Sequence, residues 1–223
     1  MEDRPHILID IHTHRTGNCP CAIVNYPFEC PFHPAKGQYY STGIHPWSLK
    51  APMPEPAWQR LEEQCADCRM LAVGEAGIDK LAKAPLPLQI EAFKRQAQIA
   101  ERHERPLIVH CVRAMEELLA VRRELRPRQP WVWHGFRGKA QQAAQLLKAG
   151  FFLSFGERYA EDALAMMPPE RLFLETDESR LPIGDILQNA ACVRSIPAEE
   201  LQKIVRKNIQ NVFFKPRKPS GCR

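Results

Sequence analysis

Pro106-Leu107-Ile108-Val109 is a short apolar run in which polar and apolar residues do not alternate. Such runs are typical of strands that are buried on both faces of a parallel sheet. Comparable strand-like runs recur along the 223 residues, at 7–9, 22–24, 39–42, 70–73, 131–133, 151–154 and 172–174. The sequence therefore favours an α/β fold built on a parallel sheet.

Segments with helical periodicity lie between these runs. Apolar residues recur at steps of three and four in 86–100, with polar residues opposite, and helical patterns also cover 114–125, 139–148 and 198–213. Eight strands that alternate with helices predict a single (β/α)8 TIM barrel over residues 1–214. Only residues 13–21 separate the first two strands, too few for an ordinary crossover helix, so we expect a compact barrel with a shortened first crossover.

The charge of the chain is unevenly distributed. The net charge is +5, but residues 201–223 contain seven Lys or Arg and no acid, so the remainder carries 5 − 7 = −2. Residues 215–223 form a basic tail that we expect to be flexible; it is either a solvated segment or a contact for DNA phosphates. No apolar run approaches the ~18 residues of a membrane span, and the start lacks an apolar signal core. We therefore expect a cytoplasmic protein with no membrane partner, and a monomer.

Side chains that bind metals follow several of the strand runs. Asp10-Ile11-His12-Thr13-His14 follows the first run, and strand alternation would place both of its histidines on one face. Further candidate ligands follow later runs: Glu75, His110, His134 and Asp177. Because the carboxyl ends of barrel strands meet at one mouth, these four histidines and two acids would converge there. Imidazole and carboxylate ligands together predict a site for divalent cations.

Six motifs occur in a fixed order over most of the chain. They are Asp10-Ile11-His12-Thr13-His14, Thr42-Gly43-Ile44-His45-Pro46, Val73-Gly74-Glu75-Ala76-Gly77-Ile78-Asp79, Leu107-Ile108-Val109-His110-Cys111, Trp133-His134-Gly135-Phe136-Arg137-Gly138 and Leu174-Glu175-Thr176-Asp177. In this order they resemble the TatD-family metal-dependent hydrolases of the amidohydrolase-like barrel superfamily. Several members of that family are DNases that cut from the 3′ end. The resemblance implies a hydrolase of ester bonds whose substrate is DNA or another phosphodiester.

The resemblance also implies a role for each matching residue. It implies two divalent ions, of the Mg²⁺, Mn²⁺ or Zn²⁺ class, with Glu75 as the bridging ligand and Asp177 as the group that handles the proton of the attacking water. These two residues are therefore the catalytic candidates. The remaining implied ligands are His12 and His14, with Asp177, for the first ion and His110 and His134 for the second. His45 would line the phosphate-binding part of the pocket, and Arg113 could reach the same anion.

One motif departs from the family pattern. The family usually continues Asp-Ala-Pro-Tyr-Leu after Leu-Glu-Thr, whereas this chain has Asp177-Glu178-Ser179-Arg180-Leu181. The change adds Glu178 and Arg180 to the expected rim, and we take Arg180 as a candidate for substrate binding. Two alternatives to a nuclease stay open: a hydrolase of a small ester, amide or phosphate ester on the same metals, and a non-catalytic metal-binding subunit of a larger assembly.

Of three other groups of residues, two have two interpretations each. Cys19, Cys21, Cys30 and His33 lie within fifteen residues and either bind a structural zinc ion or form a cysteine-containing loop. Cys65 and Cys68 end a helix without a redox context, so we expect two thiols. Trp131 and Trp133 are expected in the core, with base stacking as the alternative.

Overall fold

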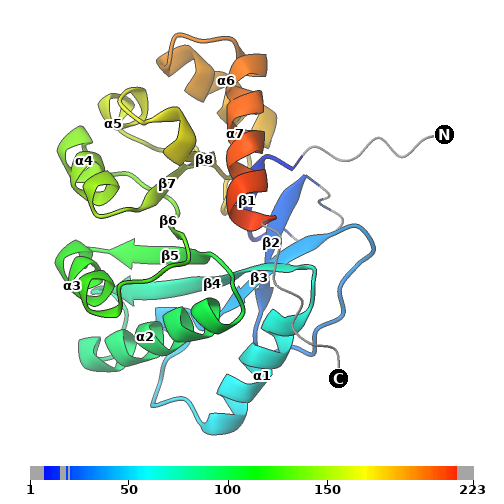
Figure 1. Cartoon of the computed structure of the whole chain (residues 1–223), viewed down its shortest axis with the longest axis vertical. Helices are drawn as coiled ribbons and strands as arrows, with labels where there is room; N and C mark the ends of the chain where they lie inside the picture. Colours follow the sequence, from blue (N-terminus) through cyan, green and yellow to red (C-terminus); the bar gives the residue numbers. More distant parts are fainter. Residues whose placement is uncertain (1–7, 16–18, 20, 215–223) are drawn as a thin grey trace.

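Eight parallel strands close into a barrel in the computed structural model, which describes residues 8–15, 19 and 21–214 (Figure 1). Neighbouring strands pair in sequence order, and the last strand pairs with the first through Leu174 and Asp10. The strands are β1 (Asp10–Thr13), β2 (Ala22–Pro27), β3 (Tyr39–Gly43), β4 (Met70–Asp79), β5 (Leu107–Val112), β6 (Trp131–Trp133), β7 (Phe152–Phe155) and β8 (Leu172–Leu174). The expected (β/α)8 TIM barrel is thus confirmed.

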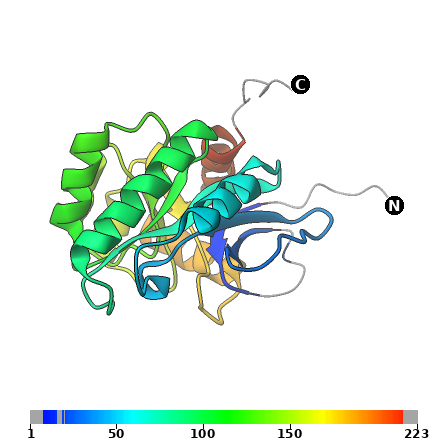
Figure 2. The same ribbon diagram turned by 90° about the horizontal axis from the view of Figure 1, so that it is seen from below.

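Helices surround the strands on the outside of the barrel (Figures 1 and 2). They are α1 (Glu55–Ala66), α2 (Leu86–Arg102), α3 (Met115–Leu125), α4 (Ala140–Lys148), α5 (Glu161–Ala165), α6 (Ile183–Val193) and α7 (Ala198–Phe213). Helices α5 and α6 lie outside the predicted segments; α5 has only five residues, too few to show a helical period. Among the described residues, no helix combines the length and the apolar character that a membrane crossing requires.

The first two crossovers show no helix in the residues that the structure describes. Between β1 and β2 the described residues contain no helix, which confirms the shortened first crossover. Residues 28–38, between β2 and β3, also contain none, and this segment extends outward from the barrel (Figure 2, blue). The basic tail, residues 215–223, and Ile7 lie outside the described residues.

Several strands differ in their bounds from the apolar runs that predicted them, β1 and β4 most of all. β1 begins at Asp10, after the run at 7–9, and β4 continues beyond Val73 to Asp79. The backbone ladder explains the longer β4, because Ala76 through Asp79 still pair with β5. Apolar composition marks only the part of a strand packed among apolar neighbours. Several candidate ligands therefore lie inside strands rather than after them.

Helix α2 fixes the ends of two strands through buried glutamines. Gln96 accepts a hydrogen bond from Ile44 N (2.7 Å) and donates to Ile44 O (3.0 Å). Gln89 holds Asp79 in the same way, with distances of 2.7 Å to its N and 3.0 Å to its O. Both glutamines point inward, contrary to the expectation that the polar residues of this helix lie opposite its apolar stripe. Buried backbone groups need partners, and these amides provide them.

Gly77 lies where the backbone of β5 approaches β4 closely. A Cβ atom at Gly77 would lie 1.8 Å from the carbonyl oxygen of His110, a backbone atom that cannot move aside alone. We expect Gly77→Ala to lower the free energy of unfolding by about 3 kcal/mol, the upper end for overpacking. The measurement is the urea midpoint followed by circular dichroism.

Gly184→Ala is the matched control, because a Cβ atom at Gly184 in α6 meets nothing within 4 Å. Alanine also favours helix, so this variant should be as stable as the parent or slightly more stable. Equal midpoints for the two variants would contradict the close approach at Gly77.

Candidate metal centre at the barrel mouth

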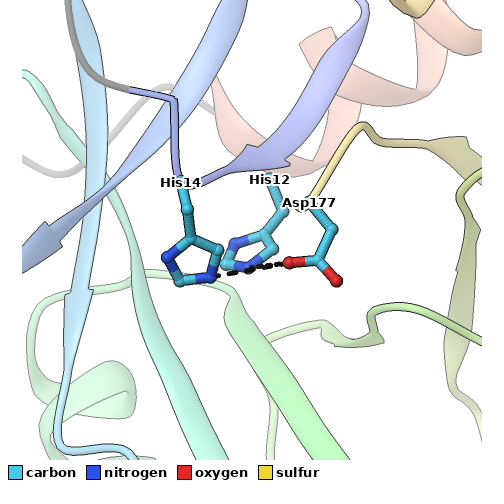
Figure 3. Close-up of side chains that lie close together, drawn as sticks. All are labelled: His12, His14 and Asp177. Carbon is cyan, nitrogen blue, oxygen red and sulfur yellow. Dashed lines mark ion pairs between the residues drawn. The ribbon is translucent and has the colours of Figure 1, made fainter. Parts of the chain in front are cut away.

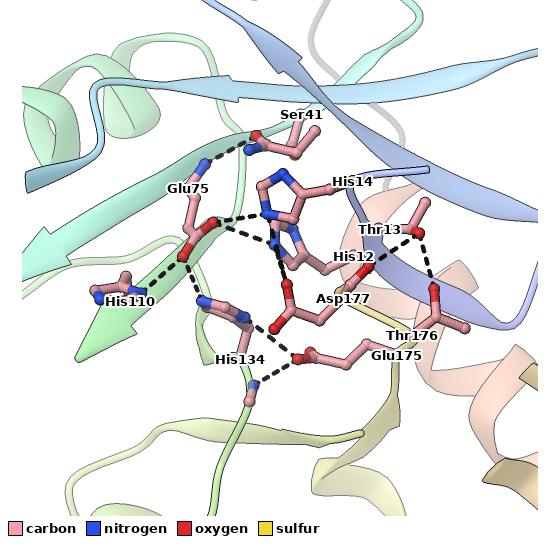
Figure 4. Close-up of polar contacts among 12 residues, drawn as sticks. His12, Thr13, His14, Ser41, Glu75, His110, His134, Glu175, Thr176 and Asp177 are labelled. Atoms are coloured by element: carbon pink, nitrogen blue, oxygen red, sulfur yellow. Dashed lines mark hydrogen bonds and ion pairs between the residues drawn. The ribbon is translucent and has the colours of Figure 1, made fainter. Parts of the chain in front are cut away.

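The carboxylate of Glu75, on β4, lies among imidazoles contributed by four other strands and their ends. Figure 4 shows those of His12, His14, His110 and His134. Around its Oε1 lie His110 Nδ1 and His134 Nε2, each at 2.7 Å, and His45 Nε2 at 3.3 Å. Around its Oε2 lie His14 Nε2 at 3.2 Å and His12 Nε2 at 3.3 Å. The two oxygens of one buried carboxylate therefore face two separate groups of histidines.

Opposite charges hold this cluster together. Burial raises the pKa of Glu75, but the charge of His134 and the hydrogen bond with His110 outweigh it and hold the pKa well below its usual range. Burial likewise lowers the pKa of His134, yet the charges of Glu75 and Glu175 hold it well above its usual range. The site therefore favours a positive charge between its carboxylates. A divalent cation would satisfy the same preference and displace the proton.

The histidines around Glu75 Oε2, His12 and His14, lie beside a second carboxylate, which follows the last strand. His12 and His14 point toward Asp177, whose Oδ1 lies 3.8 Å from His12 Nε2 and 3.5 Å from His14 Nε2 (Figure 3). The backbone sets this position: Asp177 N donates to His12 O (2.9 Å), and Asp177 O accepts from His14 N (3.2 Å). Asp177 has a φ of 50°, a left-handed conformation that Asp and Asn adopt more readily than most residues.

The donor set fits a bound metal. Both ring nitrogens of His12 are buried, and neither makes a hydrogen bond of good geometry with the described residues. Such orphaned groups are costly unless a ligand completes them. One donor atom from each of His12, His14 and Asp177 lies within 4.8 Å of the others, and a second such group is formed by His45, Glu75 and His110. Imidazole and carboxylate donors suit divalent ions of the Zn²⁺ and Mn²⁺ type.

Two further buried carboxylates lie behind ligand histidines, and a third, Asp10, lies beside the centre. Glu175 Oε1 lies 3.2 Å from His134 Nδ1, and Asp79 Oδ2 lies 3.3 Å from His110 Nε2. Asp10 turns toward β8, where it accepts hydrogen bonds from Thr176 N (3.0 Å) and Thr176 Oγ1 (2.7 Å). Burial raises the pKa of Asp10 to about 7. Carboxylates behind ligating histidines fix the orientation of the ring.

Sequence reasoning missed the roles of these three residues. Asp10 was expected only to share a face with His12 and His14, and it lies in none of the ligand groups found among the described residues. Each of the three falls inside a quoted motif, so their positions offered a signal. Nothing in the sequence indicated that these three carboxylates are buried, because their burial depends on strands that are distant in the chain.

The remaining candidate residues lie at different distances from this centre. His45 lies among the possible ligands, while Arg113 is exposed and lines the same mouth, a pocket of about 970 Å³. Arg180 lines an adjoining pocket of about 410 Å³ instead, together with Arg137 and Arg158. Their roles in binding substrate stay predictions.

The cysteine groups do not form a metal site in the described part of the chain. Among residues 8–15, 19 and 21–214, no group of three possible ligands includes Cys19, Cys21, Cys30 or His33. Cys65 is buried in α1 and Cys68 is exposed, and both are free thiols. The expectation of two unpaired thiols is thus confirmed.

Comparisons with known proteins point to one family. A family model described as TatD related DNase matches residues 33–214. The uncharacterized metal-dependent hydrolase YcfH of Escherichia coli (strain K12) is 29% identical over 196 residues, which cover 78% of this chain and 73% of that protein. The 3'-5' ssDNA/RNA exonuclease TatD of Cronobacter turicensis is 29% identical over 177 residues, which cover 72% of this chain and 65% of that protein.

A solved structure supports the fold independently. The crystal structure of YJJV, a TatD homolog from Escherichia coli K12, matches with a TM-score of 0.79 and covers 95% of this chain and 99% of that chain at 21% identity. The motif from Asp10 to His14 precedes the residues that the family model matches. The place of this motif in the centre is supported by the contacts of His12 and His14 with Glu75 and Asp177.

Glu175 offers a test of the orienting carboxylates. Its side chain is fully buried and also accepts a hydrogen bond from Gly135 N (2.6 Å). Glu175→Gln keeps the size of the side chain but removes its charge from behind His134. We expect Mn²⁺ affinity, measured by isothermal titration calorimetry, to fall about 10–100-fold.

Glu178→Gln is the control, because it removes the same charge from an exposed position three residues along the chain. Its Mn²⁺ affinity should stay close to that of the parent. Equal affinities for parent and Glu175→Gln would show that Glu175 does not support the metal ligands.

Proposed function

Because this chain belongs to the TatD family of metal-dependent hydrolases, we propose that it hydrolyses phosphodiester bonds at the 3′ end of DNA with the help of two divalent cations. One observation carries the proposal: the two oxygens of Glu75 face two separate groups of histidines. A carboxylate placed in this way suits a bridging ligand between two ions. The relative named as an exonuclease on single-stranded DNA and RNA supports this choice of substrate.

In this proposal the two groups would divide the ligands between two ions. His12, His14 and Asp177 would hold one ion, His110 and His134 would hold the other, and Glu75 would contact both. Bound there, the cations would act as Lewis acids toward phosphoryl oxygens and would lower the pKa of water.

Asp177 is suited to accept the proton of the attacking water. Its side chain is 28% exposed, so water can reach it, and its backbone is fixed to β1 on both sides. Arg113, exposed at the same mouth, would place a positive charge near the phosphate. A general base positioned in this way contributes about 10²–10⁴-fold to a rate.

A substrate panel tests the proposal. Chelated protein would be assayed with Mg²⁺, Mn²⁺ and Zn²⁺ added back, on single-stranded DNA with a free or a blocked 3′ end. We expect release of mononucleotides from the free 3′ end only. Hydrolysis of a small ester or amide, with no activity on any oligonucleotide, would favour the alternative substrate class. The observation that supports this alternative is the pair of charged residues beside the mouth, Glu178 and Arg180.

Glu75→Ala tests the bridge. Removal of the carboxylate leaves the two histidine groups with no shared ligand, so we expect fewer bound ions per chain and a loss of activity by several orders of magnitude. Elemental analysis after dialysis against Mn²⁺ gives the stoichiometry, and circular dichroism checks the fold. Glu91→Ala, at an exposed position on α2, should keep the stoichiometry of the parent. A Glu75→Ala protein with the metal content and turnover of the parent would exclude the bridge.

Asp177→Asn tests the base. Asn keeps the size, a coordinating oxygen and the tolerance of a positive φ, but it cannot accept the proton. We expect stability and much of the metal to be retained while kcat falls about a hundredfold or more. Asp185→Asn, exposed in the first turn of α6, serves as the control and should turn over like the parent. Comparable kcat values for Asp177→Asn and the control would remove Asp177 from the mechanism.

A further inference from the structure

Trp47 presents an exposed indole at the mouth of the barrel. It lies in a short 3₁₀ turn (Pro46–Ser48) directly after His45, and it is 68% exposed. The other tryptophans, Trp58, Trp131 and Trp133, are at most 8% exposed. The core position expected for Trp131 and Trp133 is therefore confirmed, although Trp133 also borders the mouth pocket. Trp47 is by far the most exposed of the four tryptophans.

A buried carboxylate, that of Asp79, holds the indole in place. Trp47 Nε1 donates to Asp79 Oδ2 (2.6 Å), and Asp79 Oδ1 accepts from Leu81 N (2.7 Å). Asp79 therefore holds the side chain of Trp47 and the backbone of Leu81, and both residues have exposed side chains (68% and 61%). A fixed, exposed apolar surface beside a polar pocket is typical of a ligand-binding surface.

This surface lies one side chain away from the proposed metal centre. Asp79 Oδ2 also lies 3.3 Å from His110 Nε2, and the ring centroids of Trp47 and His110 are 6.2 Å apart. Trp47, His110 and Arg113 line the same pocket, of about 970 Å³. The base and the phosphate of a single nucleotide can therefore reach the indole and the centre together.

We infer that Trp47 is a stacking platform for a nucleobase of the substrate strand, adjacent to the phosphate that is cleaved. The inference rests on the proposed function and extends it from the reaction to the recognition of the strand. An indole accepts any base, because every base has a π face, so the platform gives affinity for nucleic acid without sequence preference. The positive side chains of Arg113 and Arg137 on the same mouth suit the phosphates that accompany the base.

The competing interpretation is that Trp47 only supports His45. The indole packs edge-on against the imidazole of His45, with centroids 5.0 Å apart. However, the hydrogen bond between the two residues comes from the backbone, since Trp47 N donates to His45 Nδ1 (3.1 Å). Truncation of the indole keeps this contact. The two interpretations therefore differ in whether the effect of truncation depends on the presence of a base.

The experiment compares two oligonucleotides that carry the same charge: a ten-nucleotide oligomer of dA, and the same oligomer with abasic residues at its 3′ end. The quantity measured is the ratio of kcat/KM for the two substrates. We expect Trp47→Ala to lower this ratio about tenfold, mainly through KM, the scale of one stacked base. Trp47→Phe, which keeps an aromatic face, and Met166→Ala, an exposed apolar residue that does not line this pocket, should keep the ratio of the parent. An equal loss on both substrates would overturn the inference and assign Trp47 a positioning role.

Fluorescence supplies a readout that does not depend on turnover. In Asp177→Asn protein with Mg²⁺, the emission of exposed Trp47 should be quenched by the dA oligomer and much less by an abasic one. Absence of this quenching, while the parent still degrades DNA, would overturn the platform and leave the proposed function standing. Quenching by the dA oligomer, in a parent protein that degrades no nucleic acid, would instead support the platform and overturn the proposed reaction.

Discussion

A negative charge buried inside a barrel is the constraint on which this site depends. Glu75 is 5% exposed, and a carboxylate at such a position is costly unless opposite charges or donors surround it. Imidazoles from β1, β5, the ends of β3 and β6 and the residue after β1 meet this requirement together. The same arrangement that makes the carboxylate tolerable creates two sets of donors for cations. The same imidazoles therefore both stabilise the buried carboxylate and offer donors to a cation.

The ring of histidines is in turn fixed by a second layer of polar groups. Glu175 and Asp79 lie behind His134 and His110, and Gln89 of α2 holds the backbone of Asp79. Asp79 additionally fixes the indole of Trp47, so a single carboxylate contacts both a candidate ligand and the exposed rim. Orientation of the ligands is thus supported by helices on the outside of the barrel as well as by the strands.

The sequence predicted the features that depend on local pattern. Buried parallel strands are largely apolar, so seven of the eight overlap runs such as Pro106-Leu107-Ile108-Val109, and β1 begins directly after its run. Strand ends pointed to His110 and His134 as neighbours. Features that depend on contacts between distant segments were missed. The inward glutamines of α2 look like ordinary surface residues in sequence, and Trp47 looks like a core residue. Arg180 illustrates the same limit, because the turn after β8 directs it to an adjoining pocket.

The contact between β1 and the residues after β8 joins positions that are 164 residues apart in the chain, Thr13 and Asp177. During synthesis, the N-terminal histidine pair exists long before the carboxylate that completes it. An unfinished chain thus contains His12 and His14 without Asp177. Assembly of the complete candidate centre therefore coincides with closure of the barrel, because the contact between β1 and the residues after β8 is what brings these side chains together.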